Sequence, residues 1–306
     1  LAGDHTRMTG TVLEEGLRGA GGQLLNSQGH RFMFDYDEKG ERATRDVVSR
    51  AIYAEMRKSN SSPNGGVYIS MSHLGPDMVR SKFPGMVKRC LDSGFDLAAG
   101  KVEVVPTAHY LMGGIIVDVE TRTEMPGLYV AGEDAGGAHG SNRLGGNGVA
   151  NSTVYGGVAG DVMGQDAKQM AHLRDPDKGV LEAEMIRACQ PFGKASSPLV
   201  DLRRDLRQVM WDDVGVMRTE SGIKQGRIAL QDISSALDDI GVDDTTRAFN
   251  LTWHDWLNLK NLVDMSKVVA EAALTRENSR GAHYREDYPD SEISVNLILL
   301  VSEKQR

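Results

Sequence analysis

Apolar residues at helical spacing dominate the last third of the chain. Over residues 257–277 they recur three and four positions apart and form one broad face. Residues 201–211 and 221–240 show the same spacing, whereas residues 166–178 are polar and predict a linker or a frayed helix. The pattern therefore predicts a C-terminal helical bundle of about 130 residues.

Residues 1–103 mix strand and helix patterns. Two apolar runs around a polar turn predict a hairpin over residues 24–33, and residues 67–71 predict a strand. Thr44 is the expected N-cap of an amphipathic helix, and two further helices are expected over residues 75–83 and 84–93. This α+β unit is expected to end near Glu103.

Glycine becomes frequent after Val104. Residues 115–118 and 127–132 are apolar runs that predict short strands, the second suited to a buried parallel strand. A glycine-rich loop follows, and Asn147 opens a helix of small residues that reaches about residue 163. The helix dipole and the free N–H groups at such a helix start favour negative charge.

Composition narrows the class of protein. The 306 residues are 40% hydrophobic and 25% charged, as expected of a globular protein with two or three domains. The net charge of −8 and the lack of a basic stripe argue against nucleic-acid binding. Cys90 and Cys189 lack partners at metal-ligand spacing, so we expect reduced thiols of a cytosolic protein and no metal site.

The two ends of the chain carry no targeting signal. No apolar run approaches the roughly 18 residues of a membrane span, and no signal peptide is present. The sequence begins at Leu1 without a start methionine, as though within a domain. We therefore expect a piece of a longer polypeptide.

The candidate chemistry lies between residues 109 and 147. His109 and Arg143 can supply cations to an anionic substrate, and the dense glycines around them let backbone approach a flat or phosphorylated ligand. A set of surface turns would explain any one of these glycines, but not the whole block.

Five motifs in this order resemble the flavoprotein subunit of succinate dehydrogenases and fumarate reductases. They are residues 15–22, 31–33 with 45–50, 109–157, 214–219 and 279–289. The resemblance implies an α+β fold with three parts. These are a capping domain over 1–103, the returning part of an FAD-binding domain over 104–165, and a helical domain over 166–306.

The resemblance also implies an enzyme that interconverts succinate and fumarate by hydride transfer to FAD. Arg50 matches the arginine that shuttles the proton, and Glu15 and Asp46 match its relay. His109 and Arg143 match residues that hold the substrate carboxylates. Glu14 stands where a substrate-contacting threonine is common.

Several positions match the FAD contacts of the family. Glu133 follows an expected strand and would accept hydrogen bonds from ribose hydroxyls. The backbone of Gly148 and Val149 would meet the pyrimidine edge of the flavin, at a helix start that stabilises negative charge. Gly113, Gly114 and Asn147 complete the expected cofactor set.

The family's first dinucleotide-binding glycine motif and its flavin-linking histidine are both missing from this sequence. By resemblance, electrons pass to an iron–sulfur subunit with a membrane anchor, in the tricarboxylic acid cycle and electron transport. The flavoprotein would then be cytoplasmic and peripheral at the inner face of the membrane.

Two other functions stay open, as does the direction of the reaction. L-aspartate oxidase shares the capping fold and the flavin site, but its loop usually has Ala-Ser where this chain has Gly145 and Gly146. That difference favours succinate and fumarate. The missing cofactor elements instead favour a non-catalytic fragment that binds a partner protein.

Overall fold

The computed structural model describes residues 10–58, 61–170, 172 and 175–290. The chain divides into two compact units, Leu1–Tyr110 and Leu111–Arg306. Each unit has its own hydrophobic core. The mixture of a small sheet and many helices confirms the predicted α+β class.

The first unit is built on a three-stranded antiparallel sheet. Its strands are β1 (Gln23–Leu25), β2 (Val67–Ser70) and β3 (Lys101–Val104), in the order β1-β2-β3. Leu24 pairs with Ile69, and Ile69 pairs with Val102, so the buried side chains of the three strands share one face.

Four helices accompany this sheet. They are α1 (Gly16–Gly19), α2 (Arg45–Arg57), α3 (Pro76–Lys82) and α4 (Pro84–Leu91). Prolines begin α3 and α4, where the missing N–H has no helical partner to lose. Thr44 precedes α2 as expected, and Val48, Ala51 and Ile52 on α2 enter the core of the unit.

The predicted hairpin over residues 24–33 forms only in part: the Asn26 N–H donates to the His30 carbonyl at 3.0 Å across the turn, but no second strand follows within this range. β1 ends at Leu25, which makes a single bridge to Arg31, and a 3-10 turn follows over Phe32–Asp35. Phe32 and Met33 are both fully buried. Neighbouring residues of a strand point to opposite faces, so the turn lets both side chains enter one core.

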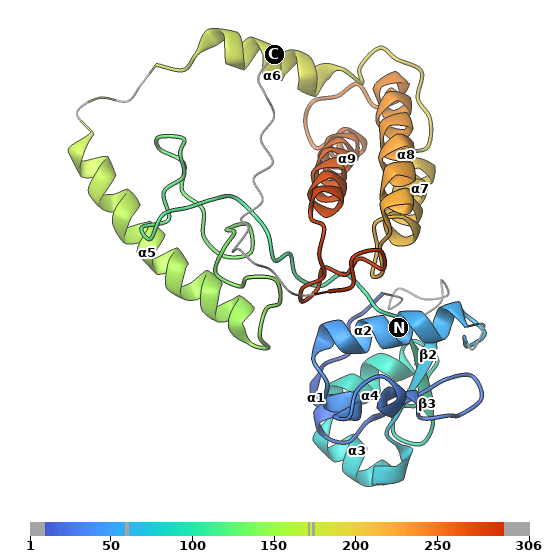
Figure 1. Cartoon of the computed structure of the whole chain (residues 1–306). Coiled ribbons are helices and arrows are strands. Elements are labelled where there is room, and N and C mark those ends of the chain that lie inside the picture. The colour runs from blue at the N-terminus through green and yellow to red at the C-terminus, as the bar shows by residue number, and fades with distance from the viewer. Residues whose placement is uncertain (1–9, 59–60, 171, 173–174, 291–306) are drawn as a thin grey trace. The chain divides into compact units, whose positions relative to one another are not determined.

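The second unit contains the long helices. They are α5 (Asn147–Gln169), α6 (Lys178–Cys189), α7 (Leu199–Asp212), α8 (Glu220–Asp239) and α9 (Leu251–Thr275). Helices α7, α8 and α9 lie side by side (Figure 1), with α8 against both of the others. Trp256 is fully buried between them and donates its ring N–H to the Leu237 carbonyl at 3.2 Å.

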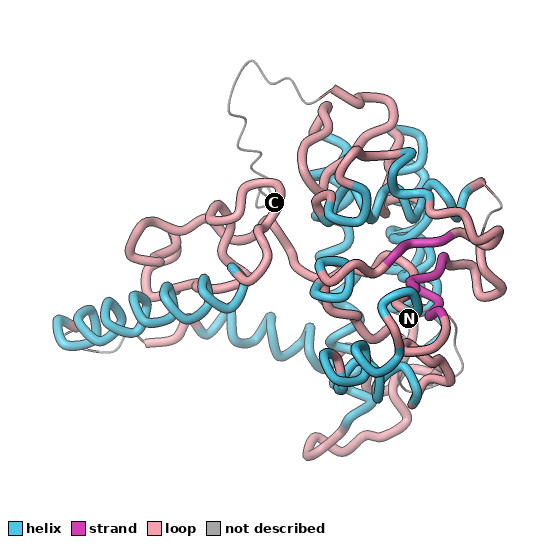
Figure 2. Tube along the Cα trace, turned by 90° about the horizontal axis from the view of Figure 1, so that it is seen from below, coloured by secondary structure: helices cyan, strands magenta, loops and turns pink. Residues whose placement is uncertain are grey.

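The expected strands over 115–118 and 127–132 do not form. Residues 105–146 contain only loops and turns (Figure 2), with isolated bridges between Ile115 and Ala135 and between Arg122 and Tyr129. A buried parallel strand needs cover on both faces. Leu128 is 42% exposed, so its apolar run lacks that cover.

The connection between α5 and α6 is shorter than the polar interval over residues 166–178 predicts. Helix α5 continues to Gln169, and α6 begins at Lys178. Asp177 starts α6 by accepting the Gly179 and Val180 N–H groups at 2.8 and 3.2 Å. Among the described residues, no helix combines the length and apolar character that crossing a bilayer requires.

Two isoleucines on α8 test the core of the helical bundle. Ile223 is fully buried, whereas Ile228 is 67% exposed. We expect Ile223→Ala to lower the free energy of unfolding by about 2–5 kcal/mol, because it leaves a cavity. The matched Ile228→Ala variant should change it by less than about 0.5 kcal/mol. Equal losses in urea unfolding would show that this core assignment is wrong.

Candidate functional site

Two glycine loops of the second unit touch through their backbones. The Ile115 N–H donates to the Asp134 carbonyl at 2.8 Å, and the Gly136 N–H donates to the Ile115 carbonyl at 2.9 Å. A Cβ on Gly114 would lie 2.3 Å from the Asp134 oxygen, and the φ of Gly114 is +150°. No side chain fits at Gly114, so the contact requires glycine.

Glu133 lies beside this contact. One of its carboxylate oxygens accepts the Leu111 N–H at 2.9 Å, and its side chain is exposed. Glu133 and the exposed Gly113–Gly114 segment, both expected to contact the cofactor, thus lie on loops that touch. The exposed carboxylate can accept further hydrogen bonds.

The start of α5 is fixed against the same loop. The buried Asn151 donates from its side-chain amide to the Gly132 carbonyl at 3.1 Å and lies 3.2 Å from His139 Nε2. A Cβ on Gly132 would lie 2.9 Å from Ser152 Oγ. The sequence did not single out Asn151. A polar residue in the first turns of a helix otherwise rich in glycine, alanine and valine was the available signal.

The beginning of α5 fits the electron-rich edge of a flavin. Gly146 precedes the helix in the left-handed conformation, with φ +83°, and makes no side-chain cap. The Asn147 N–H donates to the Leu144 carbonyl at 3.2 Å, so the backbone N–H groups of Gly148 and Val149 are the ones that this helix start, which lacks a side-chain cap, can present to a ligand. The two touching loops around Gly114 and Gly136 are here called the glycine cradle. Together with Glu133 and this cradle, the N–H groups form a set of hydrogen-bond donors and acceptors that suits FAD.

Arg143 lies on the loop just before α5. Its guanidinium is half-buried, and Nη1 donates to the Leu144 carbonyl at 3.1 Å.

In the first unit, Arg50 and Asp46 lie one turn apart on α2. Arg50 Nη2 donates to Asp46 Oδ2 at 3.1 Å. The Asp46 side chain is 9% exposed and that of Arg50 is 23% exposed. The helix spacing of four residues brings the predicted shuttle and one relay carboxylate together.

Glu15, the second expected relay residue, forms ion pairs with Arg18 and Arg45. One oxygen contacts Arg18 Nη2 at 3.2 Å, and the other accepts Arg45 Nε at 2.8 Å. Arg18 also donates to the Glu41 carbonyl at 2.6 Å, and burial lowers its pKa. The sequence did not single out Arg18 or Arg45, although Arg45 directly precedes Asp46.

The remaining predicted substrate residues are exposed. Glu14 lies just before Glu15, and His109 lies in a segment without regular structure. His109 and the pair on α2 belong to the first unit, whereas Arg143 belongs to the second.

The motif over residues 279–289 forms a buried polar cluster in the second unit. Arg285, 1% exposed, donates to the Ala273 and Leu274 carbonyls at 3.0 Å and makes two hydrogen bonds of 2.8 Å to Asp287. These contacts hold the motif to the end of α9. The guanidinium lowers the pKa of Asp287 to about 2.

His283 completes this cluster as a neutral imidazole. Burial, reinforced by the charge of Arg218, lowers the pKa of His283 to about 4. Arg218 Nη1 lies 2.7 Å from His283 Nδ1, and His283 Nε2 lies 3.2 Å from the Arg276 carbonyl. These partners fix the tautomer, because Nδ1 accepts from Arg218 while Nε2–H donates to the carbonyl.

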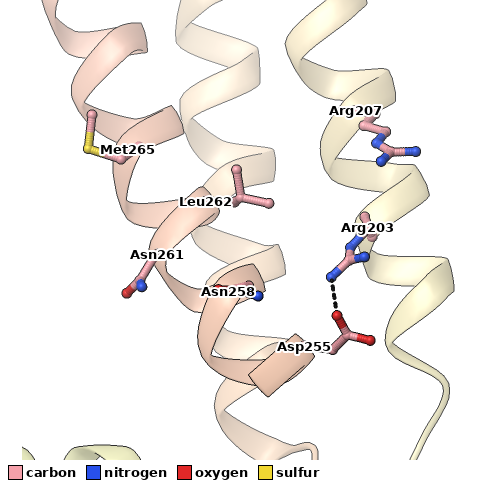
Figure 3. A pocket seen from close by; sticks show the side chains of 7 residues that line it. All are labelled: Arg203, Arg207, Asp255, Asn258, Asn261, Leu262 and Met265. Carbon is pink, nitrogen blue, oxygen red and sulfur yellow. Dashed lines mark hydrogen bonds and ion pairs between the residues drawn. The ribbon is translucent and has the colours of Figure 1, made fainter. Parts of the chain in front are cut away.

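A hollow of about 480 Å³ lies elsewhere, on the face of α7 and α9 (Figure 3). Its lining residues are Arg203, Arg207, Asp255, Asn258, Asn261, Leu262 and Met265. Arg203 pairs with Asp255 across it at 3.3 Å. No predicted substrate or cofactor residue lines this hollow, so it is separate from the candidate site.

Comparisons with known proteins agree with these motifs. A family model described as an FAD binding domain matches residues 3–149, and one described as the C-terminal part of the fumarate reductase flavoprotein matches residues 203–296. The chain is 38% identical over 295 residues to a subunit of the CoM/CoB fumarate reductase of Methanothermobacter marburgensis, covering 96% of this chain and 53% of the relative.

Other relatives widen the range of activities. L-aspartate oxidase 1 of Ralstonia nicotianae is 36% identical over 286 residues, covering 92% of this chain and 50% of the relative. A solved chain of Escherichia coli quinol fumarate reductase superposes with a TM-score of 0.82 at 28% identity, over 94% of this chain and 52% of that one. The chain thus spans about half the length of the curated relatives it matches.

The lowered pKa of His283 predicts acid sensitivity. The unfolded chain takes up a proton near pH 6.5 and the folded chain only near pH 4, so the stabilisation is complete above pH 6.5 and is lost as pH falls toward 4. We expect His283→Asn to reduce the fall in unfolding temperature between pH 6.5 and 4.5. His254→Asn, at an exposed position on α9, is the control. An unchanged pH profile in the His283 variant would contradict the assignment.

Proposed function

Because the chain belongs to the family of FAD-dependent fumarate reductase and succinate dehydrogenase flavoproteins, we propose that it interconverts succinate and fumarate. The observation that carries this proposal is the pairing of Arg50 with Asp46 at 3.1 Å on α2. A half-buried arginine bonded to a shielded carboxylate can give up a proton and recover one.

The proton step is proposed for the α2 pair. When bound, FAD supplies the hydride chemistry at one substrate carbon. Arg50 delivers a proton to the neighbouring carbon of fumarate, and in the reverse direction takes it from succinate. An ordinary arginine has a pKa above about 12, so a free guanidinium would be a weak acid. Asp46 returns the proton to Arg50, and Glu15 is the proposed next member of the relay.

Substrate orientation is proposed for three residues. Arg143 holds one carboxylate, because its planar guanidinium matches two parallel carboxylate hydrogen bonds. His109 donates to the other carboxylate, and Glu14 contacts the substrate where relatives commonly have threonine. The exposure of His109 and Glu14 supports access to a ligand.

Cofactor binding is proposed for the second unit's glycine cradle. Glu133 accepts from ribose hydroxyls, beside Gly113 and Gly114. At the start of α5, Gly148 and Val149 donate backbone N–H groups to the flavin and stabilise negative charge there, and Asn147 is the remaining member of the proposed cofactor set. The Gly114 contact with Asp134 supports this assignment, because it brings the two loops of the cradle together.

The partners are proposed from the relatives. One relative is named as the flavoprotein subunit of an 8-methylmenaquinol:fumarate reductase from Wolinella succinogenes. We propose that electrons from this chain likewise pass to an iron–sulfur subunit with a membrane anchor. The flavoprotein would then be peripheral, at the cytoplasmic face of the membrane, and would serve the tricarboxylic acid cycle and electron transport.

L-aspartate oxidation is the second candidate function. It is favoured by the 36% identity to an L-aspartate oxidase, and both substrates are four-carbon dicarboxylates. The glycines at 145 and 146 favour succinate, because L-aspartate oxidases usually have Ala-Ser at these positions.

The visible spectrum of the purified protein, supplied with FAD, separates these functions. We expect a flavin band that bleaches on anaerobic addition of succinate, because hydride transfer reduces the flavin. Bleaching by L-aspartate alone would replace the proposal with the second candidate. A protein that retains no flavin would be the non-catalytic chain.

Arg50→Gln tests the proton step. We expect the flavin spectrum to persist while turnover falls about 10²- to 10⁴-fold, the usual contribution of a general acid. Arg57→Gln, at the exposed C-terminal end of the same helix, should keep turnover near the original rate. Wild-type turnover in the Arg50 variant would remove Arg50 from the mechanism.

A further inference from the structure

The 279–289 motif contacts the loop that carries Arg143. The Ala282 N–H donates to the Ser141 carbonyl at 2.9 Å. A Cβ on Gly281 would lie 2.5 Å from that oxygen and 2.8 Å from Ser141 Oγ. The φ of Gly281 is +58°. Both the close approach and the backbone conformation therefore favour glycine at this position.

The motif side of this contact is firmly held. Ser279 Oγ donates to the Tyr288 carbonyl at 2.7 Å and accepts the Arg285 N–H at 2.8 Å. The Glu286 N–H donates to the Arg218 carbonyl at 2.7 Å. With the Arg285 bonds to the end of α9, these contacts make residues 279–289 a fixed support.

The Arg143 side of the contact is a partly exposed loop whose described backbone bonds are longer. The Gly140 N–H donates to the Gly137 carbonyl at 3.2 Å, and the Asn147 N–H donates to the Leu144 carbonyl at 3.2 Å. Both are local turns. Ser141 lies between these turns, two residues before Arg143. Its bond to the support therefore restrains the backbone next to Arg143.

We propose that Gly281 and Ala282 are positioning residues for Arg143. Their contact with Ser141 fixes the loop so that the guanidinium meets a substrate carboxylate with both hydrogen bonds. The inference rests on the proposed function, in which Arg143 binds the dicarboxylate. It assigns a role to a motif that the reaction itself does not use.

A methyl group at residue 281 would force the two sides apart. Because the support is held at many points, the Ser141 loop is the side that moves. Bidentate pairing of guanidinium and carboxylate depends on geometry, so a displaced Arg143 keeps its charge but loses part of its hydrogen bonding.

Gly281→Ala tests the proposal, with Gly193→Ala as the matched control. Gly193 also has a positive φ, +81°, but nothing lies within 4 Å of its added Cβ. The two variants therefore share the backbone strain and differ in the clash with Ser141. Binding of malonate, an unreactive dicarboxylate, is measured on the flavin-loaded protein, together with KM, kcat, flavin content and unfolding temperature.

We expect Gly281→Ala to raise the malonate dissociation constant and the succinate KM roughly tenfold, as for the loss of one charge-assisted hydrogen bond. Flavin content should match that of Gly193→Ala. Equal malonate affinity in the two variants would overturn the inference while leaving the proposed function intact.

Two further outcomes separate the inference from its premise. Wild-type protein that binds flavin but no malonate would instead refute the proposed dicarboxylate site. If Gly281→Ala also lost flavin, or unfolded at a lower temperature than Gly193→Ala, the contact would be structural, and the positioning role would be rejected.

Discussion

Glycines with no room for a Cβ let the loops of residues 105–146 approach one another and neighbouring segments closely. This segment has no strand, so a sheet does not hold it. Gly114 meets the Asp134 carbonyl, Gly132 meets Ser152 at the start of α5, and Gly281 meets the Ser141 carbonyl. In each case a Cβ would lie within 3 Å of another atom, which side chains do not tolerate without displacement. The loops that contain Gly114, Gly132 and Ser141 can therefore hold these positions only because glycine stands at each contact.

Polar contacts then fix α5 at both ends. Asn151 bonds to the Gly132 carbonyl near its start. Near its end, Asp166 accepts Arg122 Nε and Nη2 at 3.1 and 3.0 Å and also pairs with the Tyr129 hydroxyl. Few residues of α5 are buried, so apolar packing contributes little to its position. Because the Asp166 cluster is half-exposed and partly screened by solvent, it orients the helix more than it stabilises it.

The spacing of apolar residues predicted the helices that bury one face. It failed over residues 105–146, where close glycine contacts take the place of apolar packing. Helices α7, α8 and α9 agree with the apolar spacing to within a few residues, because their buried faces form a single core. The Leu128 run was apolar enough for a buried strand, but such a strand needs other elements to cover both of its faces, and Leu128 is 42% exposed. Arg50 and Asp46 were singled out by the family resemblance, and their spacing of four residues on α2 explains why they pair. The pairing of Glu15 with Arg45 joins segments 30 residues apart, which no local pattern encodes.

The proposed proton step and the proposed binding step depend on different constraints. Asp46 and Arg50 are one turn apart on α2, whose own hydrogen bonds and whose buried Val48 and Ile52 set their separation. That geometry does not depend on the conformation of a loop in the second unit. The position of Arg143 depends instead on loops that are held by close glycine contacts and by single backbone hydrogen bonds. Substitutions at those glycines should therefore weaken dicarboxylate affinity before they slow proton transfer, so KM is the more sensitive of the two kinetic constants.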